Sequence, residues 1–80
     1  MKVYVSKYAL ANGIQEMDDM ELFVYDNGAR KYVANHKHYL LLGKGAHETR
    51  EAAVAAAEEM RQEKIASLRK QLARLESLTF

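Results

Sequence analysis

Three histidines are the residues of this chain best suited to metal chemistry. His36 and His38 are two positions apart, so they would share one face of a strand. With His47 they could form a three-histidine zinc site, because imidazole nitrogen is a common zinc ligand. No close spacing ties His47 to the other two, and the sequence contains no cysteine to complete such a site. We therefore expect exposed loop histidines, with no metal and no cofactor.

Patterns for phosphate binding and for catalysis are equally weak. The segment Gly43-Lys44-Gly45 precedes a predicted helix N-terminus, which is a natural anion site, and a flexible turn is the alternative interpretation. The segment matches neither the P-loop nor the dinucleotide-binding pattern. Asp18 and Asp19 are adjacent, so in a strand they point to opposite faces and form no acid-base pair. We predict no catalytic residue and no enzymatic activity.

Tyrosine is the one enriched residue type with recognition chemistry, at five tyrosines and no tryptophan in 80 residues. In an extended first strand Tyr4 and Tyr8 would share a face, and Arg30 and Tyr32 of a third strand could lie nearby. An exposed surface of this kind suits protein recognition and also stacking of RNA bases. The structural alternative is that tyrosine is a good strand former with its hydroxyl in water. We expect these four residues to form a partner-binding surface.

Composition and charge narrow the classes of protein. Eighty residues allow one domain, and 49% hydrophobic with 29% charged residues is ordinary globular composition. Twelve basic and eleven acidic residues give a net charge of +1, far from that of a protein that coats nucleic acid. The absence of cysteine excludes disulfides, and no apolar run approaches the roughly 20 residues that span a bilayer. We expect a soluble protein of the cytoplasm.

The chain has no proline, so glycine must end its secondary structure elements. Asn12-Gly13 follows a run of good strand formers from residue 3 to residue 10, and Asn-Gly is a strong hairpin signal. A two-residue turn there predicts Tyr8 opposite Met17, with Leu10 opposite Gln15. The two aspartates that follow Met17 are poor strand formers, so we expect a bulge or short loop after it.

A second Asn-Gly turn gives a clearer hairpin. Asn27-Gly28 lies between two strand-forming runs and predicts that Tyr25 pairs with Arg30 and Phe23 with Tyr32. The apolar run over residues 38–42 fits either a fourth, buried strand or a connector under a helix.

The last 30 residues predict one long helix. Thr49 is a good N-cap, and residues 50–78 contain no glycine and are dominated by strong helix formers. Such a helix has about 29 residues and a length of roughly 44 Å, whereas four strands span only about 15–20 Å. The helix must therefore protrude or break.

The two halves of this helix carry different apolar patterns. Residues 52–57 are small and allow close approach to a sheet, whereas the second half has an a/d seam of large side chains spaced by three, four and three residues: Ile65, Leu68, Leu72 and Leu75. The seam shifts phase near residues 60–65. Either both halves pack on one intramolecular core, or the second half pairs with another chain. We favour the second interpretation and predict a homodimer through the seam, because these side chains would otherwise face water.

Charge distribution along the helix suggests a direction for that pairing. Residues 46–60 carry four glutamates and one arginine, and residues 61–80 carry five basic and two acidic residues. This asymmetry makes an antiparallel helix pair complementary, whereas a parallel pair sets Lys64 near Arg69 of the partner. Complementarity to the helix dipole is the simpler alternative explanation.

Both ends of the chain resemble small proteins encoded by bacteriophages and prophages. The resemblance rests on the opening KVYVSKYALANGI and on the closing helix EAAVAAAEEMRQEKIASLRKQLARLESLTF, which together cover more than half of the sequence. It implies a small phage-type protein acting in the bacterial cytoplasm. Proteins of this size and origin commonly bind and inhibit host machinery, including CRISPR defence complexes. The resemblance assigns no role to any residue.

We therefore predict a single α+β domain over residues 1–80. An antiparallel meander of three to four strands within residues 1–45 is followed by one long helix over 49–78, whose second half is the oligomerisation seam. The predicted function is a non-enzymatic protein-binding module, a phage-type inhibitor of a bacterial defence complex with a host protein as its target. The alternative is a small nucleic-acid-binding protein that uses the Tyr and Lys/Arg sheet face or the basic half of the helix.

Overall fold

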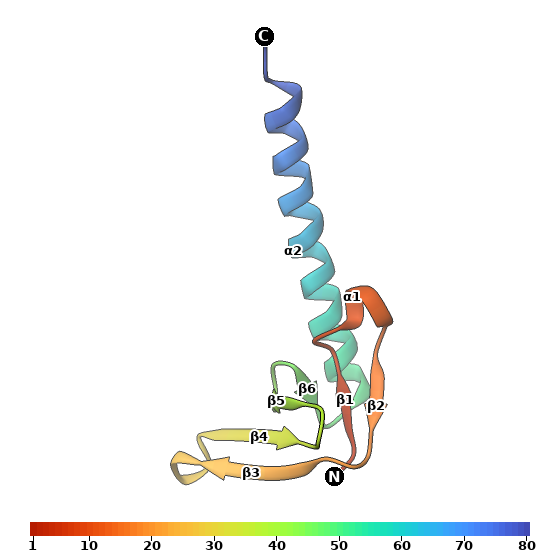
Figure 1. The fold of residues 1–80 in the computed structure, drawn as a ribbon, viewed down its shortest axis with the longest axis vertical. Coiled ribbons are helices and arrows are strands. Elements are labelled where there is room, and N and C mark those ends of the chain that lie inside the picture. The colour runs from red at the N-terminus through yellow and green to blue at the C-terminus, as the bar shows by residue number, and fades with distance from the viewer.

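A computed structural model describes residues 1–80 as an α+β fold, in which two small antiparallel sheets adjoin one long C-terminal helix (Figure 1). The predicted fold class is confirmed, although the strands number six and form two sheets in place of one meander. The elements in chain order are β1 (Val3–Val5), α1 (Ala9–Asn12), β2 (Gln15–Met17), β3 (Glu21–Tyr25), η1 (Asp26–Gly28), β4 (Arg30–Ala34), β5 (Tyr39–Leu41), β6 (Ala46–His47) and α2 (Arg50–Glu76).

Each sheet has three strands, but only the second sheet is built from strands that are consecutive along the chain. One sheet has the order β2-β1-β6, and the other is a meander in the order β3-β4-β5. The chain leaves the first sheet after Met17 and enters the second at Glu21. The expected interruption at the paired aspartates is therefore confirmed, and it is the point at which the chain changes sheet.

The hairpin predicted at Asn12-Gly13 is wrong. Strand β1 ends at Val5, and its register with β2 sets Val3 opposite Met17 and Val5 opposite Gln15, so Tyr8 does not pair with Met17. Residues 9–12 form one helical turn, because Ala-Leu-Ala favours helix over strand. Gly13, at φ 72°, ends that turn, and Asn-Gly is a common helix C-terminus as well as a hairpin turn.

The hairpin predicted at Asn27-Gly28 is confirmed. Tyr25 lies opposite Arg30 and Phe23 opposite Tyr32, with Asp26, Asn27 and Gly28 all at positive φ in the connecting loop. Of the two alternatives for residues 38–42, the strand is correct. Strand β5 pairs with β4 and contributes the buried Leu40.

The hydrophobic core lies between the two sheets and is small. Six buried apolar side chains form it, drawn from both sheets and from the loop that joins them: Val3, Val5, Met20, Val33, Leu40 and Ala46. Nine of the 80 residues are buried altogether. A core of this size can cover only a limited length of helix.

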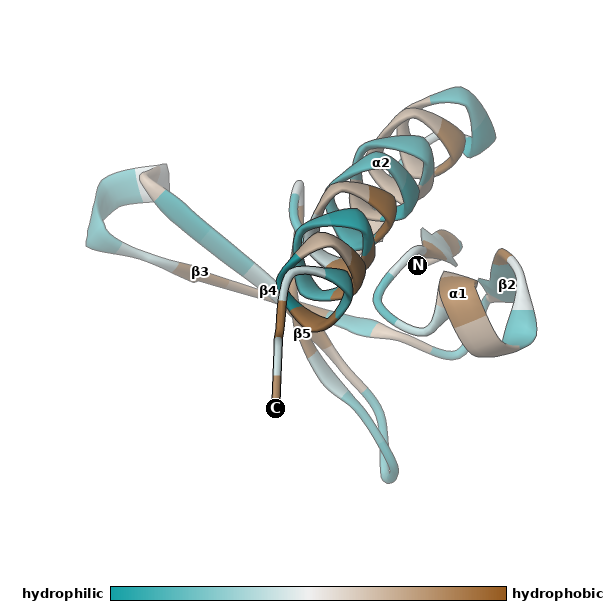
Figure 2. Ribbon diagram, turned by 90° about the horizontal axis from the view of Figure 1, so that it is seen from above, coloured by the Kyte–Doolittle hydropathy of each residue, from teal (hydrophilic) through white to brown (hydrophobic).

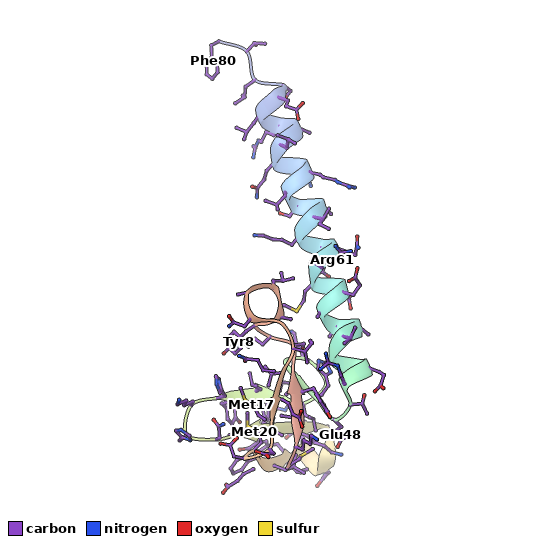
Figure 3. All side chains as sticks on the ribbon, turned by 90° about the vertical axis from the view of Figure 1, so that its right-hand side faces the viewer. Tyr8, Met17, Met20, Glu48, Arg61 and Phe80 are labelled. Carbon is purple, nitrogen blue, oxygen red and sulfur yellow. The ribbon has the colours of Figure 1, made fainter.

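Helix α2 packs on this core only at its beginning. Thr49 caps it by accepting a hydrogen bond from the backbone N–H of Ala52 at 3.2 Å, as predicted. Ala53 is its one buried residue, and the neighbouring elements are α1, β1 and β6. Figure 3 shows Arg61 where the helix has left the body and Phe80 at its far end. The molecule is accordingly elongated, with extents of 55 × 26 × 23 Å.

The helical turn at α1 gives a prediction on stability. Gly13 has φ 72° and ψ −172°, a backbone region that only glycine occupies readily, so Gly13→Ala should lower the free energy of unfolding by about 1–3 kcal/mol. Gly45→Ala is the matched control, because its φ is ordinary and the added methyl would lie 3.5 Å from the side chain of Leu40. Urea denaturation compares the two, and equal stabilities would contradict this account of Gly13.

Candidate functional site

The C-terminal half of α2 presents the predicted seam to solvent. Ile65 is half-buried, and Leu68, Leu72 and Leu75 are 50%, 56% and 65% exposed. Leu78, beyond the helix, is also exposed. Figure 2 shows hydrophobic segments recurring along α2 toward its C-terminal end. No other element of the chain covers these side chains, so the alternative that both halves pack on one intramolecular core does not hold in this structure.

The seam faces a different direction from the part of α2 that packs on the body. At 100° per residue, the seam lies about 90° around the helix axis from the face centred on Ala53 and Met60. Near the departure point, Glu58 accepts hydrogen bonds from Arg61 and Gln62, and these bonds lower the pKa of the Glu58 carboxyl. The seam therefore occupies its own side of a regular helix.

A second exposed surface is the outer face of the β3-β4-β5 sheet. The strand register places four aromatic side chains on this face, with Leu41 beside them. The rings of Tyr32 and Tyr39 stack with centroids 4.9 Å apart, and Tyr25 meets Tyr32 edge to face at 5.6 Å. We call this surface the aromatic face and define it by Phe23, Tyr25, Tyr32 and Tyr39.

The aromatic face is close to electrically neutral. Hydrogen bonding with the Tyr25 side chain, together with partial desolvation, raises the pKa of Tyr39 above its ordinary value. Arg30, on the same face, donates a hydrogen bond and forms an ion pair with Asp26. The only arginine of the sheet is thus already paired.

The four residues predicted as one partner-binding surface are divided by the structure. Arg30 and Tyr32 lie together on β4, on the aromatic face. Tyr4 belongs to the other sheet, where Lys2 approaches its ring, and Tyr8 precedes α1 with its ring 5.8 Å from that of His38. The prediction of a shared face for Tyr4 and Tyr8 is wrong, because β1 ends at Val5 and the chain turns before Tyr8.

The predicted partner-binding surface omits three aromatic residues that lie on this face with Tyr32: Phe23, Tyr25 and Tyr39. The sequence could have identified Tyr25 as part of this surface, because the predicted pair Tyr25–Arg30 already sets it on the same face as Arg30. Tyr39 depended on the pairing of β5 with β4, which no turn signal in the sequence specifies.

The histidines do not gather into a metal site. His36 is exposed and His38 half-buried, but His47 is only 6% exposed, so the expectation that all three are exposed is wrong for His47. Its Nε2 atom lies 2.8 Å from the Oγ atom of Ser6, which is fully buried. No group of three or more His, Asp or Glu side chains is placed to hold a metal ion.

The Ser6–His47 pair has the residue types of a catalytic dyad but the surroundings of a structural bond. The Ser6 hydroxyl also donates to the carbonyl oxygen of Lys44 at 3.3 Å. The Ser6 hydroxyl therefore has both of its hydrogen-bond partners inside the body of the protein, which gives the pair a structural role. Since Ser6 is fully buried, the pair ties the end of β1 to β6.

Comparisons with known proteins add no assignment to these surfaces. No protein-family model, curated protein sequence or solved structure gives a significant match to this chain. Neither helix has the combination of length and apolar character that crossing a bilayer requires.

The buried dyad yields a second prediction on stability. Ser6→Ala removes the partner of a buried imidazole nitrogen, so it should lower the free energy of unfolding by about 1–3 kcal/mol. Ser67→Ala, at an exposed position of α2, is the control and should change stability by less than about 0.5 kcal/mol. Chemical denaturation measures both, and a neutral Ser6→Ala would show that the hydrogen bond contributes nothing.

Proposed function

We propose that this protein is a non-enzymatic protein-binding module that forms a homodimer through the seam of α2. The observation that carries the proposal is a regular helix whose large apolar side chains have no partner within the chain. Leu68, Leu72 and Leu75 are each at least half exposed and lie at coiled-coil spacing. Apolar stripes of this kind are typical of surfaces that another protein covers.

The exposed area of the chain supports the need for a partner. The chain exposes 6147 Å², whereas a compact monomer of 9.1 kDa exposes about 4,900 Å². The radius of gyration is 16.6 Å, against about 12 Å for a compact domain of this length. The excess of about 1,200 Å² is larger than the roughly 800 Å² that each partner buries in an interface of standard size.

The length of the projecting part of α2 also supports the need for a partner. Beyond Met60, α2 continues to Glu76, and Ile65 is the one residue of this segment that is half-buried. Most helical stability in proteins comes from packing an apolar face rather than from helix propensity. Pairing along the seam supplies that packing and removes the leucines from water.

Nucleic-acid binding is the less supported function. The segment that forms the β3-β4-β5 sheet, residues 18–42, carries four acidic and three basic residues, so the aromatic face lacks the positive field that attracts phosphate. The basic half of α2 has a polar patch that includes Lys70 and Arg74, which is the best remaining location for an anionic partner.

The biological role that we propose follows from the resemblance of both chain ends to small phage-encoded proteins. Such a protein would act on a host protein, and inhibition of a bacterial defence complex of the CRISPR type fits its size and its lack of catalytic machinery. The aromatic face is the surface on which we expect the target to bind, because tyrosine-rich neutral surfaces are typical of protein recognition.

Sedimentation equilibrium at tens of micromolar tests the proposed dimer. Leu68→Glu/Leu72→Glu should halve the mass of the wild-type assembly. The change affects four leucines per dimer, each worth about 2 kcal/mol when buried, and about 4 kcal/mol already separates a micromolar from a millimolar dissociation constant.

Ser67→Glu/Ala73→Glu is the matched control for this experiment. It adds the same two carboxylates at exposed positions on the side of α2 away from the seam, so it should leave the mass unchanged. A strictly monomeric wild type, or equal masses for the two double variants, would contradict the proposal.

A further inference from the structure

Strand β3 is a free edge of the second sheet. In the order β3-β4-β5 it hydrogen-bonds only to β4, and all five of its residues are exposed. Figure 1 shows the β3-β4 hairpin at the end of the molecule opposite the C-terminus of α2, projecting to one side. Every second residue of such a strand points its backbone N–H and C=O away from the sheet, where another strand can bind them.

This edge is apolar on both of its faces. Phe23 and Tyr25, 38% and 44% exposed, lie on the aromatic face. Leu22 and Val24, 45% and 52% exposed, lie on the opposite face. A docked helix would cover one of these faces, whereas an added strand packs its side chains along both. The pattern therefore selects a strand as the occupant.

Strand β2, an edge of the first sheet, lacks these properties. Strand β2 has three residues, and its central Glu16 forms an ion pair with Lys2. Short strands and edge charges are the usual protection of a sheet edge against pairing. Strand β3 carries its charges only at and beyond its ends, at Glu21 and Asp26.

We propose that β3 pairs antiparallel with β3 of a second copy of this chain. The two sheets then become one six-stranded sheet in the order β5-β4-β3-β3-β4-β5, with a twofold axis through Phe23. This interface is separate from the seam of α2 and does not depend on it.

The register follows from the sequence of the strand. Pairing all five residues sets Phe23 opposite the partner's Phe23, Leu22 opposite the partner's Val24, and Glu21 opposite the partner's Tyr25. Apolar side chains then meet on both faces, and no like charges lie opposite each other. A parallel alignment in register would set Glu21 against the partner's Glu21. The strand is thus complementary to itself in one orientation.

Two different twofold interfaces on one chain generate an assembly larger than a dimer, and the smallest closed form is a tetramer with three perpendicular twofold axes. The wild type should therefore have a mass of at least four chains when both interfaces form.

Disulfide crosslinking tests the strand pairing and its register, because the chain has no cysteine of its own. Phe23→Cys places two thiols directly opposite, where Cα atoms are about 4.5–5.5 Å apart and a disulfide forms readily. Val24→Cys faces the partner's Leu22, so its own two copies are more than about 7 Å apart and cannot be bridged without backbone movement. Both variants are made in the Leu68→Glu/Leu72→Glu background, which removes the seam.

Mild oxidation at tens of micromolar should crosslink Phe23→Cys at least tenfold more than Val24→Cys, as read on a non-reducing gel. Equal yields for the two variants, or no crosslinked dimer in either, would overturn the proposal. A high yield for Phe23→Cys supports it even where the seam variant fails to change the mass, so the two interfaces are tested separately.

A charge substitution gives an independent measurement without cysteine. Val24→Lys should halve the mass of the wild-type assembly in sedimentation equilibrium, and combining it with Leu68→Glu/Leu72→Glu should give the monomer of 9.1 kDa. Val54→Lys is the matched control, because Val54 is 47% exposed on α2, and the elements that α2 contacts are α1, β1 and β6. An unchanged mass for Val24→Lys would contradict the strand pairing.

Discussion

A core of six buried side chains has to hold a helix of 27 residues, and most features of this molecule follow from that mismatch. Small domains bury a smaller fraction of their surface than large ones, so such a core can stabilise only a few helical turns. Ala53 supplies the close contact at which α2 approaches the sheets. Everything beyond Met60 continues into solvent because the body ends there.

The two exposed surfaces lie at opposite ends of the elongated molecule. The seam occupies the projecting half of α2, and β3 forms the outer edge of the hairpin below the body (Figure 1). A partner on one surface therefore does not obstruct a partner on the other. Pairing through β3 would also join two aromatic faces into one continuous surface, which doubles the number of tyrosines offered to a target.

The sequence predicted the features that depend on short-range signals. Thr49 and the helix formers after it fixed the start of α2 correctly, and the predicted end at residue 78 lies two residues beyond Glu76. The Asn27-Gly28 turn predicted the register of β3 and β4. The exposed seam followed from simple lengths, because a helix of that size exceeds the reach of four short strands.

Predictions from the sequence failed where one local sequence signal is compatible with two structures, or where the structure depends on contacts between residues far apart in the sequence. Asn12-Gly13 ends a helical turn here, since the Ala-Leu-Ala before it prefers helix. The division into two sheets depends on β6, which pairs with β1 across more than 40 positions of sequence. The bond between Ser6 and His47 arises from the same pairing, so no local pattern could reveal it.

In the proposed assembly, a second copy of the chain stabilises the projecting half of α2. Hydrogen exchange of the backbone amides, measured at several protein concentrations, tests this stabilisation most directly. Protection of residues 61–76 should rise with concentration, whereas protection of residues 53–60, which pack on the body, should stay constant. Protection of residues 61–76 that is independent of concentration would contradict the account.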